Sequence, residues 1–336
     1  MSMRYVFLGG TGVKISSLAL GTMPFGDGSV DRALAREIFA RSRDAGINLF
    51  DCADVYNGGE SERILGELIA DCRDEVVITS KAYFPTGDDA NARGASRYHL
   101  RRAVEASLRR LSTDRIDIFF LHRFDDHTDL EDTLRTLDDL ISEGKILYPA
   151  ASNFAAWQVA KGLGIAERRG FIPFVAIQPM YNLAKRQAEV ELLPMAAAEG
   201  LAVLPYGPLG GGLLSGRYGV DRRPDHGRLV DNKMYATRYG DPDNYALAER
   251  FTALATEVGV HPASLAIAWV SAHPAVSAPL LGVRNLQHLK IALASQDVPI
   301  SDTHSELYQR VAALGTTPPP ATDRNEENSA HNYGSR

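Results

Sequence analysis

Cysteine is scarce in this sequence, with only Cys52 and Cys72 among its 336 residues. Two cysteines cannot form a disulfide framework, and because these two are not a C-x-x-C pair they indicate no structural zinc site. We therefore expect no bound metal. Sparse cysteine and an N-terminus without a secretory leader favour a reducing, cytoplasmic location.

Long apolar runs and an excess of basic residues are also missing. No run approaches the ~18 consecutive apolar residues that a membrane-spanning helix needs. Lysine and arginine total 36 against 42 aspartates and glutamates, which gives a formal net charge of −6. Such a chain offers neither a basic surface for nucleic acid nor a polybasic membrane patch. We expect no nucleic-acid partner and no membrane partner, and the sequence leaves the oligomeric state open.

Two common signatures are incomplete or absent. GGTG at residues 9–12 resembles the start of a dinucleotide-binding loop, but the full G-x-G-x-x-G is missing and no helical pattern follows Gly12. The nucleophile motif G-x-S-x-G is absent as well. A Rossmann domain and a serine hydrolase are therefore both disfavoured.

What the chain does contain is a regular alternation of short apolar runs and amphipathic stretches. Runs such as VVIT and IDIFFL are typical of parallel strands covered on both faces. We predict strands over residues 18–22, 49–51, 76–80, 116–122, 145–151, 175–180, 201–205 and 276–281. Capping residues and helical spacing predict helices over residues 31–45, 96–111, 129–143, 155–169 and 188–199.

Glycines follow several of these helices directly, as Gly46, Gly144, Gly170 and Gly200 do. A repeat of helix, glycine and strand is the pattern of βαβ units joined by right-handed crossovers. Eight strands favour a closed barrel over an open sheet. The predicted fold class is therefore α/β, a (β/α)8 TIM barrel, in a single domain over residues 1–314.

Three segments depart from this repeat. Residues 5–15 (YVFLGGTGVKI) predict a β-hairpin around Gly9 and Gly10, which would close the bottom of the barrel. Residues 216–244 are polar and aperiodic, as in a functional loop or lid. Residues 315–336 predict a disordered C-terminal tail.

Polar residues end three successive predicted strands, on the side of a barrel where active sites lie. Asp51 ends the second strand and Tyr56 follows it, while Lys81 and His122 end the third and fourth. Each has a simpler interpretation when taken alone: a packing tyrosine, a solvated lysine, a core histidine or a turn-capping aspartate. The joint pattern favours a site.

This combination of side chains suits carbonyl reduction. Hydride addition builds negative charge on the carbonyl oxygen, which must be protonated or held by hydrogen-bond donors. The Tyr56 hydroxyl can supply the proton, and a buried Lys81 beside it would lower its pKa from about 10. Asp51 would keep Lys81 charged, and His122 would orient the carbonyl oxygen.

The segments that carry these residues resemble the aldo-keto reductase family. The matching stretches are FDCADVYNGGESE, ITSKA, IDIFFLHRFD, ASNF, QPMYN and YGPLGGGLLSG, in order, between residue 8 and about residue 294. The resemblance implies a (β/α)8 oxidoreductase, NADPH bound without a Rossmann domain, and a catalytic tetrad of Asp51, Tyr56, Lys81 and His122.

The resemblance also implies a set of cofactor contacts. Ser152, Asn153 and Gln178 would hold the nicotinamide carboxamide, and Tyr206 would stack on the nicotinamide ring. The full implied set is Gly21, Thr22, Ser152, Asn153, Gln178, Tyr206, Gly207, Leu209, Gly211, Gly282, Arg284 and His288.

Three positions in this set depart from the family pattern. Gly207 replaces a serine that contacts the pyrophosphate, although the backbone amides after it suit phosphate oxygens. His288 stands where glutamine or arginine is usual, and Ala292 where asparagine is usual, so the hold on adenine would be weaker. Arg284 at a helix start suits a 2′-phosphate, which favours NADPH over NADH.

Other functions remain open at this stage. The enzyme could act mainly as a polyol or sugar dehydrogenase, because Tyr56 can give or take the proton. It could also be an NADPH-binding regulatory subunit like those of potassium channels. A barrel lyase or isomerase would leave Tyr56 and His122 without a role. The expected substrate is a small carbonyl compound, in a pocket with Tyr83, Phe25, Arg123 and Tyr235 as candidate lining residues.

Overall fold

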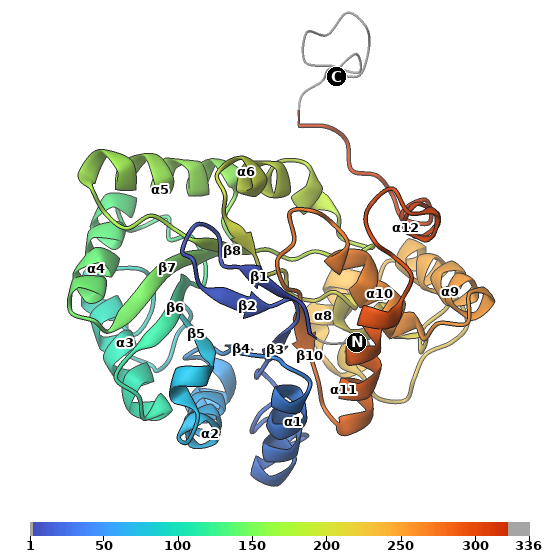
Figure 1. The fold of residues 1–336 in the computed structure, drawn as a ribbon, viewed down its shortest axis with the longest axis horizontal. Coiled ribbons are helices and arrows are strands. Elements are labelled where there is room, and N and C mark those ends of the chain that lie inside the picture. Colours follow the sequence, from blue (N-terminus) through green and yellow to red (C-terminus); the bar gives the residue numbers. More distant parts are fainter. Residues whose placement is uncertain (1–2, 322–336) are drawn as a thin grey trace, which may run out of the picture.

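Eight parallel strands form the centre of the molecule in a computed structural model, which describes residues 3–321. They are β3 (Ala19–Gly21), β4 (Leu49–Asp51), β5 (Val77–Ala82), β6 (Ile116–Leu121), β7 (Ile146–Ser152), β8 (Ala176–Gln178), β9 (Ala202–Val203) and β10 (Leu280–Gly282). Their order is β10-β3-β4-β5-β6-β7-β8-β9. The two edges also meet, because the Leu280 N–H donates to Pro205 O at 2.9 Å. The predicted (β/α)8 barrel is confirmed (Figure 1).

Helices surround this sheet on the outside (Figure 1). They include α1 (Arg32–Asp44), α2 (Glu60–Ile69), α3 (Arg97–Leu111), α4 (Leu130–Ser142), α5 (Ala156–Arg169), α6 (Leu192–Ala198), α9 (Pro242–Glu257), α10 (Pro262–Ser271), α11 (Leu286–Leu293) and α12 (Glu306–Ala312). The predicted caps form, since the Asp31 side chain accepts from Leu34 N and Ser96 from His99 N. The helix predicted from residue 188 starts later, at Leu192, which places Pro194 in the first turn where proline is tolerated.

An antiparallel hairpin precedes the barrel, as predicted. It pairs β1 (Tyr5–Phe7) with β2 (Lys14–Ser16), with Val6 opposite Ile15. Gly9 in its turn has φ +52°, and a Cβ there would lie 2.8 Å from Val175 O and 2.9 Å from Gly200 O. Those two carbonyls stand just before β8 and β9, so the hairpin covers the amino-terminal ends of the strands.

The core has two parts because each strand is covered on both faces. Ile118 and Phe120 of β6 pack inside the barrel with Leu8 and Ile15 of the hairpin region. Phe119 of the same strand packs outward against the helices. This alternation explains why IDIFFL is a continuous apolar run.

Residues 216–244 are not a loop without regular structure, so that part of the prediction is wrong, and the role as a lid stays a prediction. The segment contains α7 (Arg228–Asp231) and α8 (Lys233–Tyr239). Asn232 caps α8 by accepting hydrogen bonds from Met234 N and Tyr235 N, and Tyr239 is buried at the helix end. The helices are too short to show helical periodicity in the sequence.

The structure describes only the first part of the predicted C-terminal tail. Residues 315–321 contain no helix or strand, and the rest of the predicted tail, 322–336, lies outside the described residues.

Within residues 3–321, no single helix is long and apolar enough to cross a membrane. Only α9 and α10 taken together reach the required length and composition, and they are bent by 97°.

Candidate active site

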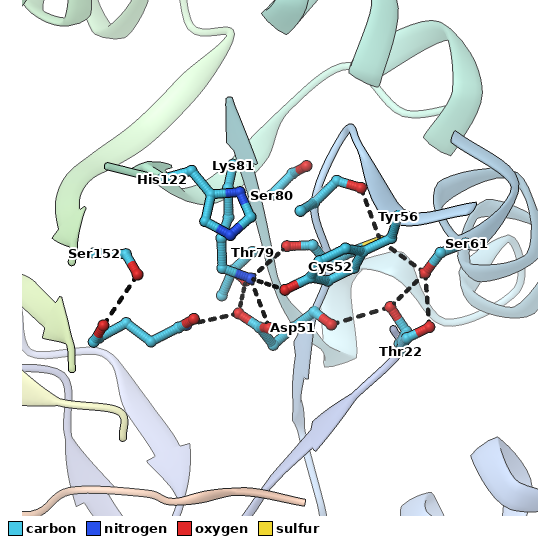
Figure 2. Close-up of polar contacts among 12 residues, drawn as sticks. Thr22, Asp51, Cys52, Tyr56, Ser61, Thr79, Ser80, Lys81, His122 and Ser152 are labelled. Carbon is cyan, nitrogen blue, oxygen red and sulfur yellow. Dashed lines mark hydrogen bonds and ion pairs between the residues drawn. The ribbon is translucent and has the colours of Figure 1, made fainter. Parts of the chain in front are cut away.

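Lys81 is the centre of the group of polar side chains at the carboxyl ends of β4, β5 and β6 (Figure 2). Its ammonium is fully buried and donates to Asp51 Oδ2 at 2.7 Å and to the carbonyl of Cys52 at 2.7 Å. The third neighbour is the Tyr56 hydroxyl at 3.4 Å. The structure therefore brings Asp51, Tyr56 and Lys81 into one hydrogen-bonded group.

Both oxygens of the buried Asp51 carboxylate accept hydrogen bonds. Besides Lys81, its Oδ1 accepts from Thr79 Oγ1 at 2.7 Å and from Gln178 Nε2 at 2.8 Å. Thr79 was not among the predicted site residues. A signal for it existed, since Thr79 and Lys81 are two residues apart on one strand and so share a face.

The electrostatics of Tyr56 differ from the sequence prediction. Part of its side chain is exposed, but desolvation of the hydroxyl region is strong and raises the pKa of Tyr56 to about 12. Lys81 acts in the expected direction and lowers it, but the effect is smaller than that of burial. Burial lowers the pKa of Lys81, but the Asp51 carboxylate, Tyr56 and Cys52 together more than offset this, so the net pKa of Lys81 is raised.

His122 follows β6 directly and is 9% exposed. Burial, and to a lesser degree the nearby Lys81 charge, hold the pKa of His122 well below its usual range. The imidazole is therefore neutral at pH 7 and carries one N–H to donate. Its Nδ1 has no hydrogen-bond partner within residues 3–321. The ring stands 6.0 Å from that of Tyr56, edge to face.

Hydroxyl and thiol groups behind Lys81 support the segment from Asp51 to Tyr56. Thr22 Oγ1 donates to the backbone carbonyl of Asp51 at 3.0 Å and contacts Ser61 Oγ at 2.9 Å. Ser61 in turn contacts Cys52 Sγ at 3.2 Å (Figure 2). Thr22, predicted as a cofactor contact, is thus also a buried support of the segment from Asp51 to Tyr56, and Ser61 is a residue that the sequence analysis missed.

Residues predicted to hold the nicotinamide are joined by hydrogen bonds to the group around Lys81 and His122. Asn153 has φ +57° and its Nδ2 donates to the carbonyl of His122 at 2.9 Å and to Ser152 Oγ at 3.0 Å. Tyr206 donates to Asn153 Oδ1 at 2.8 Å. Ser152 Oγ donates to the backbone carbonyl of Gln178 at 3.0 Å. The four residues lie at the ends of three strands beside Lys81 and His122.

The glycine-rich segment after Tyr206 is shaped by left-handed backbone. Gly207 and the three glycines 210–212 all have positive φ, and they enter the 3-10 helix η4 (Gly210–Ser215) directly after Leu209. No atom lies within 4 Å of the place where a Cβ of Gly207 would stand. A Cβ on Gly211 would instead lie 2.6 Å from Cδ1 of Tyr235, which packs on this glycine from α8.

The remaining predicted cofactor residues lie around the start of α11. Gly282 ends β10 opposite Gly21 of β3 in the ladder. Arg284, whose side chain is 39% exposed, approaches Asp27 at 3.8 Å. Burial first, and then the positive charges of Arg217 and Arg284, lower the pKa of His288.

The candidate residues for the substrate pocket are only partly supported. Phe25 is fully buried in the core, so it presents no surface to a ligand, and Tyr235 packs on Gly211. Tyr83 is partly exposed and meets Phe84 edge to face at 5.4 Å. The sequence analysis did not single out Phe84. The centre of its ring lies 4.9 Å from that of His122, so Phe84 is the aromatic residue of this segment that contacts His122.

The fold and the site together are those of an oxidoreductase built on a (β/α)8 barrel. Its Tyr, Lys, Asp and His side chains are grouped at the ends of the strands. The chain belongs to the Aldo/keto reductase family, whose model matches residues 17–312. It is 35% identical to an uncharacterized oxidoreductase of Bacillus subtilis, over 89% of this chain and 92% of the relative.

Two further relatives are named for different functions. The versiconal hemiacetal acetate reductase of Aspergillus parasiticus is 31% identical over 89% of this chain and 94% of its own length. A probable voltage-gated potassium channel subunit beta of Arabidopsis thaliana is 32% identical over 88% of this chain and 92% of its own length. The family thus includes reductases and proteins named as channel subunits.

Proposed function

We propose that this protein is an NADPH-dependent reductase of aldehydes and ketones, with Tyr56 as the general acid. The observation that carries the proposal is the placement of the Lys81 ammonium, 2.7 Å from Asp51 and 3.4 Å from the Tyr56 hydroxyl. A lysine held charged in this way stabilises the phenolate that remains after Tyr56 has given up its proton.

Each member of the group has a distinct task in this proposal. Tyr56, with a pKa of about 12, is protonated at neutral pH and is ready to donate to a carbonyl oxygen that gains negative charge. His122 is neutral and offers an N–H to orient the same oxygen. Asp51 keeps Lys81 charged, and Thr79 and Gln178 fix the position of Asp51.

The residues at the strand ends fit a nicotinamide dinucleotide. Asn153, Ser152 and Tyr206 form a polar platform for the nicotinamide end, the open backbone at Gly207 and the glycines after it suit a pyrophosphate, and Arg284 suits a 2′-phosphate. When bound there, the cofactor supplies the hydride. Gly21, Thr22, Leu209, Gly211, Gly282 and His288 complete the proposed set by position.

The substrate in this proposal is a small carbonyl compound with an apolar or aromatic body. Phe84 and Tyr83 pack edge to face beside His122 and give the approach to the catalytic group an aromatic wall. The reductase of Aspergillus parasiticus among the relatives is consistent with a carbonyl-derived substrate. We place the activity in the cytoplasm, where the two free cysteines stay reduced.

A regulatory role is the second candidate, because a relative of similar length is named as a potassium channel subunit. Such a subunit would bind the cofactor and turn over carbonyl compounds slowly or not at all. An oxidising polyol dehydrogenase is the third, because the same tyrosine can accept a proton.

Initial rates distinguish these candidates. NADPH oxidation should be measured with a panel of aromatic aldehydes, aliphatic aldehydes, ketones and aldoses, with NADH as the comparison, and alcohol oxidation with NADP+. The proposal expects steady turnover of at least one carbonyl class, faster than the reverse reaction at neutral pH. In Arg284→Ala, the KM for NADPH should rise and that for NADH should not. Absence of turnover with every compound would support the regulatory role.

A further inference from the structure

A cavity outside the active site lies beside helix α3 and the loop that follows β5. Its volume is about 410 Å3, within the ~300–1,000 Å3 of typical small-molecule sites. Its wall includes Asp54, Thr86, His99, Arg102, Arg109 and Arg110, together with Glu105, whose carboxylate pairs with Lys145 at 2.5 Å. None of these residues belongs to the catalytic group or to the proposed cofactor contacts.

Asp54 is the first unusual group in this wall. It is 2% exposed, and neither carboxyl oxygen has a hydrogen-bond partner within residues 3–321. The adjacent amide of Val55 favours the charged carboxylate but does not reach hydrogen-bond geometry. Burial, reinforced by the negative charge of Glu62, raises the pKa of Asp54 to about 8. At neutral pH Asp54 is therefore a carboxylic acid that can both donate and accept.

His99 is the second such group. It is 3% exposed, and its Nε2 has no hydrogen-bond partner in the part of the chain that the structure describes. Burial, and then the charge of Arg102, lower the pKa of His99, so the ring is neutral. Two buried, neutral and unpartnered polar groups in one cavity wall carry a desolvation penalty that a hydroxylated ligand would relieve.

The arginines of the cavity differ in whether their charge is already neutralised. Arg110 pairs with Glu62 at 2.6 Å and Arg101 with Glu143 at 2.5 Å. Arg102 and Arg109 are exposed and make no ion pair among residues 3–321. They leave two guanidinium groups at the rim available to an anion.

We propose that this cavity binds a small hydroxylated anion of the phosphorylated polyol class. Its hydroxyl groups would contact Asp54 and His99, and its phosphate would contact Arg102 and Arg109. Asp54 lies on the segment between Asp51 and Tyr56, and its N–H donates to the Lys81 carbonyl at 3.1 Å. A ligand at this site is therefore in direct contact with the segment that carries the tetrad. The proposal does not depend on the reaction proposed above.

Isothermal titration calorimetry tests the site with sorbitol 6-phosphate as the probe, in the presence of saturating NADPH, which covers the cofactor site and cannot oxidise the polyol. Sorbitol and inorganic phosphate are separate arms, since each offers only one half of the recognition. The full chain should bind the probe at least ~10-fold more tightly than either half. Arg109→Gln should lower the affinity for the probe and for inorganic phosphate alike. Asp54→Leu should lower the affinity for the probe and leave the affinity for inorganic phosphate unchanged.

The matched control is Arg36→Gln, which removes the same charge from an exposed arginine of α1 outside the cavity. It should leave the affinity for the probe unchanged. If Asp54→Leu does not fold, the comparison of Arg109→Gln with Arg36→Gln still decides the matter. Absence of probe binding, or equal loss in Arg109→Gln and Arg36→Gln, would overturn the proposal.

Discussion

At the scale of single residues, the opposing effects on Tyr56 decide how the site can work. Burial raises the pKa of its hydroxyl more than the Lys81 ammonium lowers it, and Asp51 adds to the rise. A tyrosine with a pKa of about 12 holds its proton across the neutral range. The protonated form that the proposed carbonyl reduction requires is therefore the form present at neutral pH.

Asp54 gives a prediction about the pH dependence of stability. Its folded pKa of about 8 lies above its ordinary value of 3.8, so the folded state binds the extra proton between those pH values. Stability is therefore lost as pH rises through this window. Asp54→Asn cannot ionise. We compare the stability of Asp54→Asn, as its free energy of unfolding, with that of the wild type at pH 5 and at pH 9. The advantage of the variant should be larger at pH 9, by on the order of a few kcal/mol.

Urea denaturation at both pH values measures this difference. Asp88→Asn, which removes an exposed carboxylate, is the control and should shift little between pH 5 and pH 9. A difference between Asp54→Asn and the wild type that does not change with pH would contradict the raised pKa of Asp54.

At the scale of elements, the N-terminal hairpin depends on one close backbone approach. Gly9→Ala places a Cβ within 3 Å of two backbone carbonyl oxygens, which cannot rotate away as a side chain would. Gly12→Ala, in the same turn at φ +77°, meets no atom within 4 Å. Gly12→Ala is therefore the control, and its free energy of unfolding should fall only by the ~1–2 kcal/mol that left-handed backbone costs a residue with a Cβ. Gly9→Ala should lose roughly 1–3 kcal/mol more in chemical denaturation, and equal losses would argue against the bottom closure.

The contact between α8 and the glycine segment gives a second prediction at this scale. Gly211→Ala would place a Cβ 2.6 Å from the Tyr235 ring, whereas Gly170→Ala has the same φ of +69° and open space around it. We expect Gly211→Ala to displace α8 and to raise the Kd for NADPH about 10-fold, or ~1.4 kcal/mol. Gly170→Ala should leave the Kd unchanged. Tryptophan fluorescence quenching by NADPH measures both, and equal Kd values would contradict the proposed cofactor contact.

The elements could be predicted from sequence where a local signal determined them. The Asp31 and Ser96 caps marked two helix starts, and IDIFFL marked a strand buried on both faces. β9 is shorter than the predicted 201–205, and α7 and α8 were missed, because these elements are only two to seven residues long. The longer helices α2, α9 and α10 were not predicted either. Eight of the ten residues of α10 are buried, so this helix has no polar face to mark it in the sequence.

At the scale of the whole molecule, the barrel brings together groups that lie far apart in the sequence. Gln178 and Asp51 are separated by 127 residues yet share a hydrogen bond of 2.8 Å. The strand-end rule predicted that Asp51, Lys81 and His122 would meet, because parallel strands end on one side. It could not predict that Gln178 would bond to Asp51, or that burial of Tyr56 would outweigh the Lys81 charge, since both depend on packing.

Tyr56 is proposed to donate the proton in carbonyl reduction, and one comparison tests this role most directly. The rate of NADPH oxidation with the best carbonyl substrate should be measured for the wild type and for Tyr56→Phe, which keeps the ring and removes only the hydroxyl. NADPH binding should be retained, and kcat should fall by about 10²–10⁴-fold, the usual contribution of a general acid. A Tyr56→Phe variant that reduces the substrate at the wild-type rate would contradict the account.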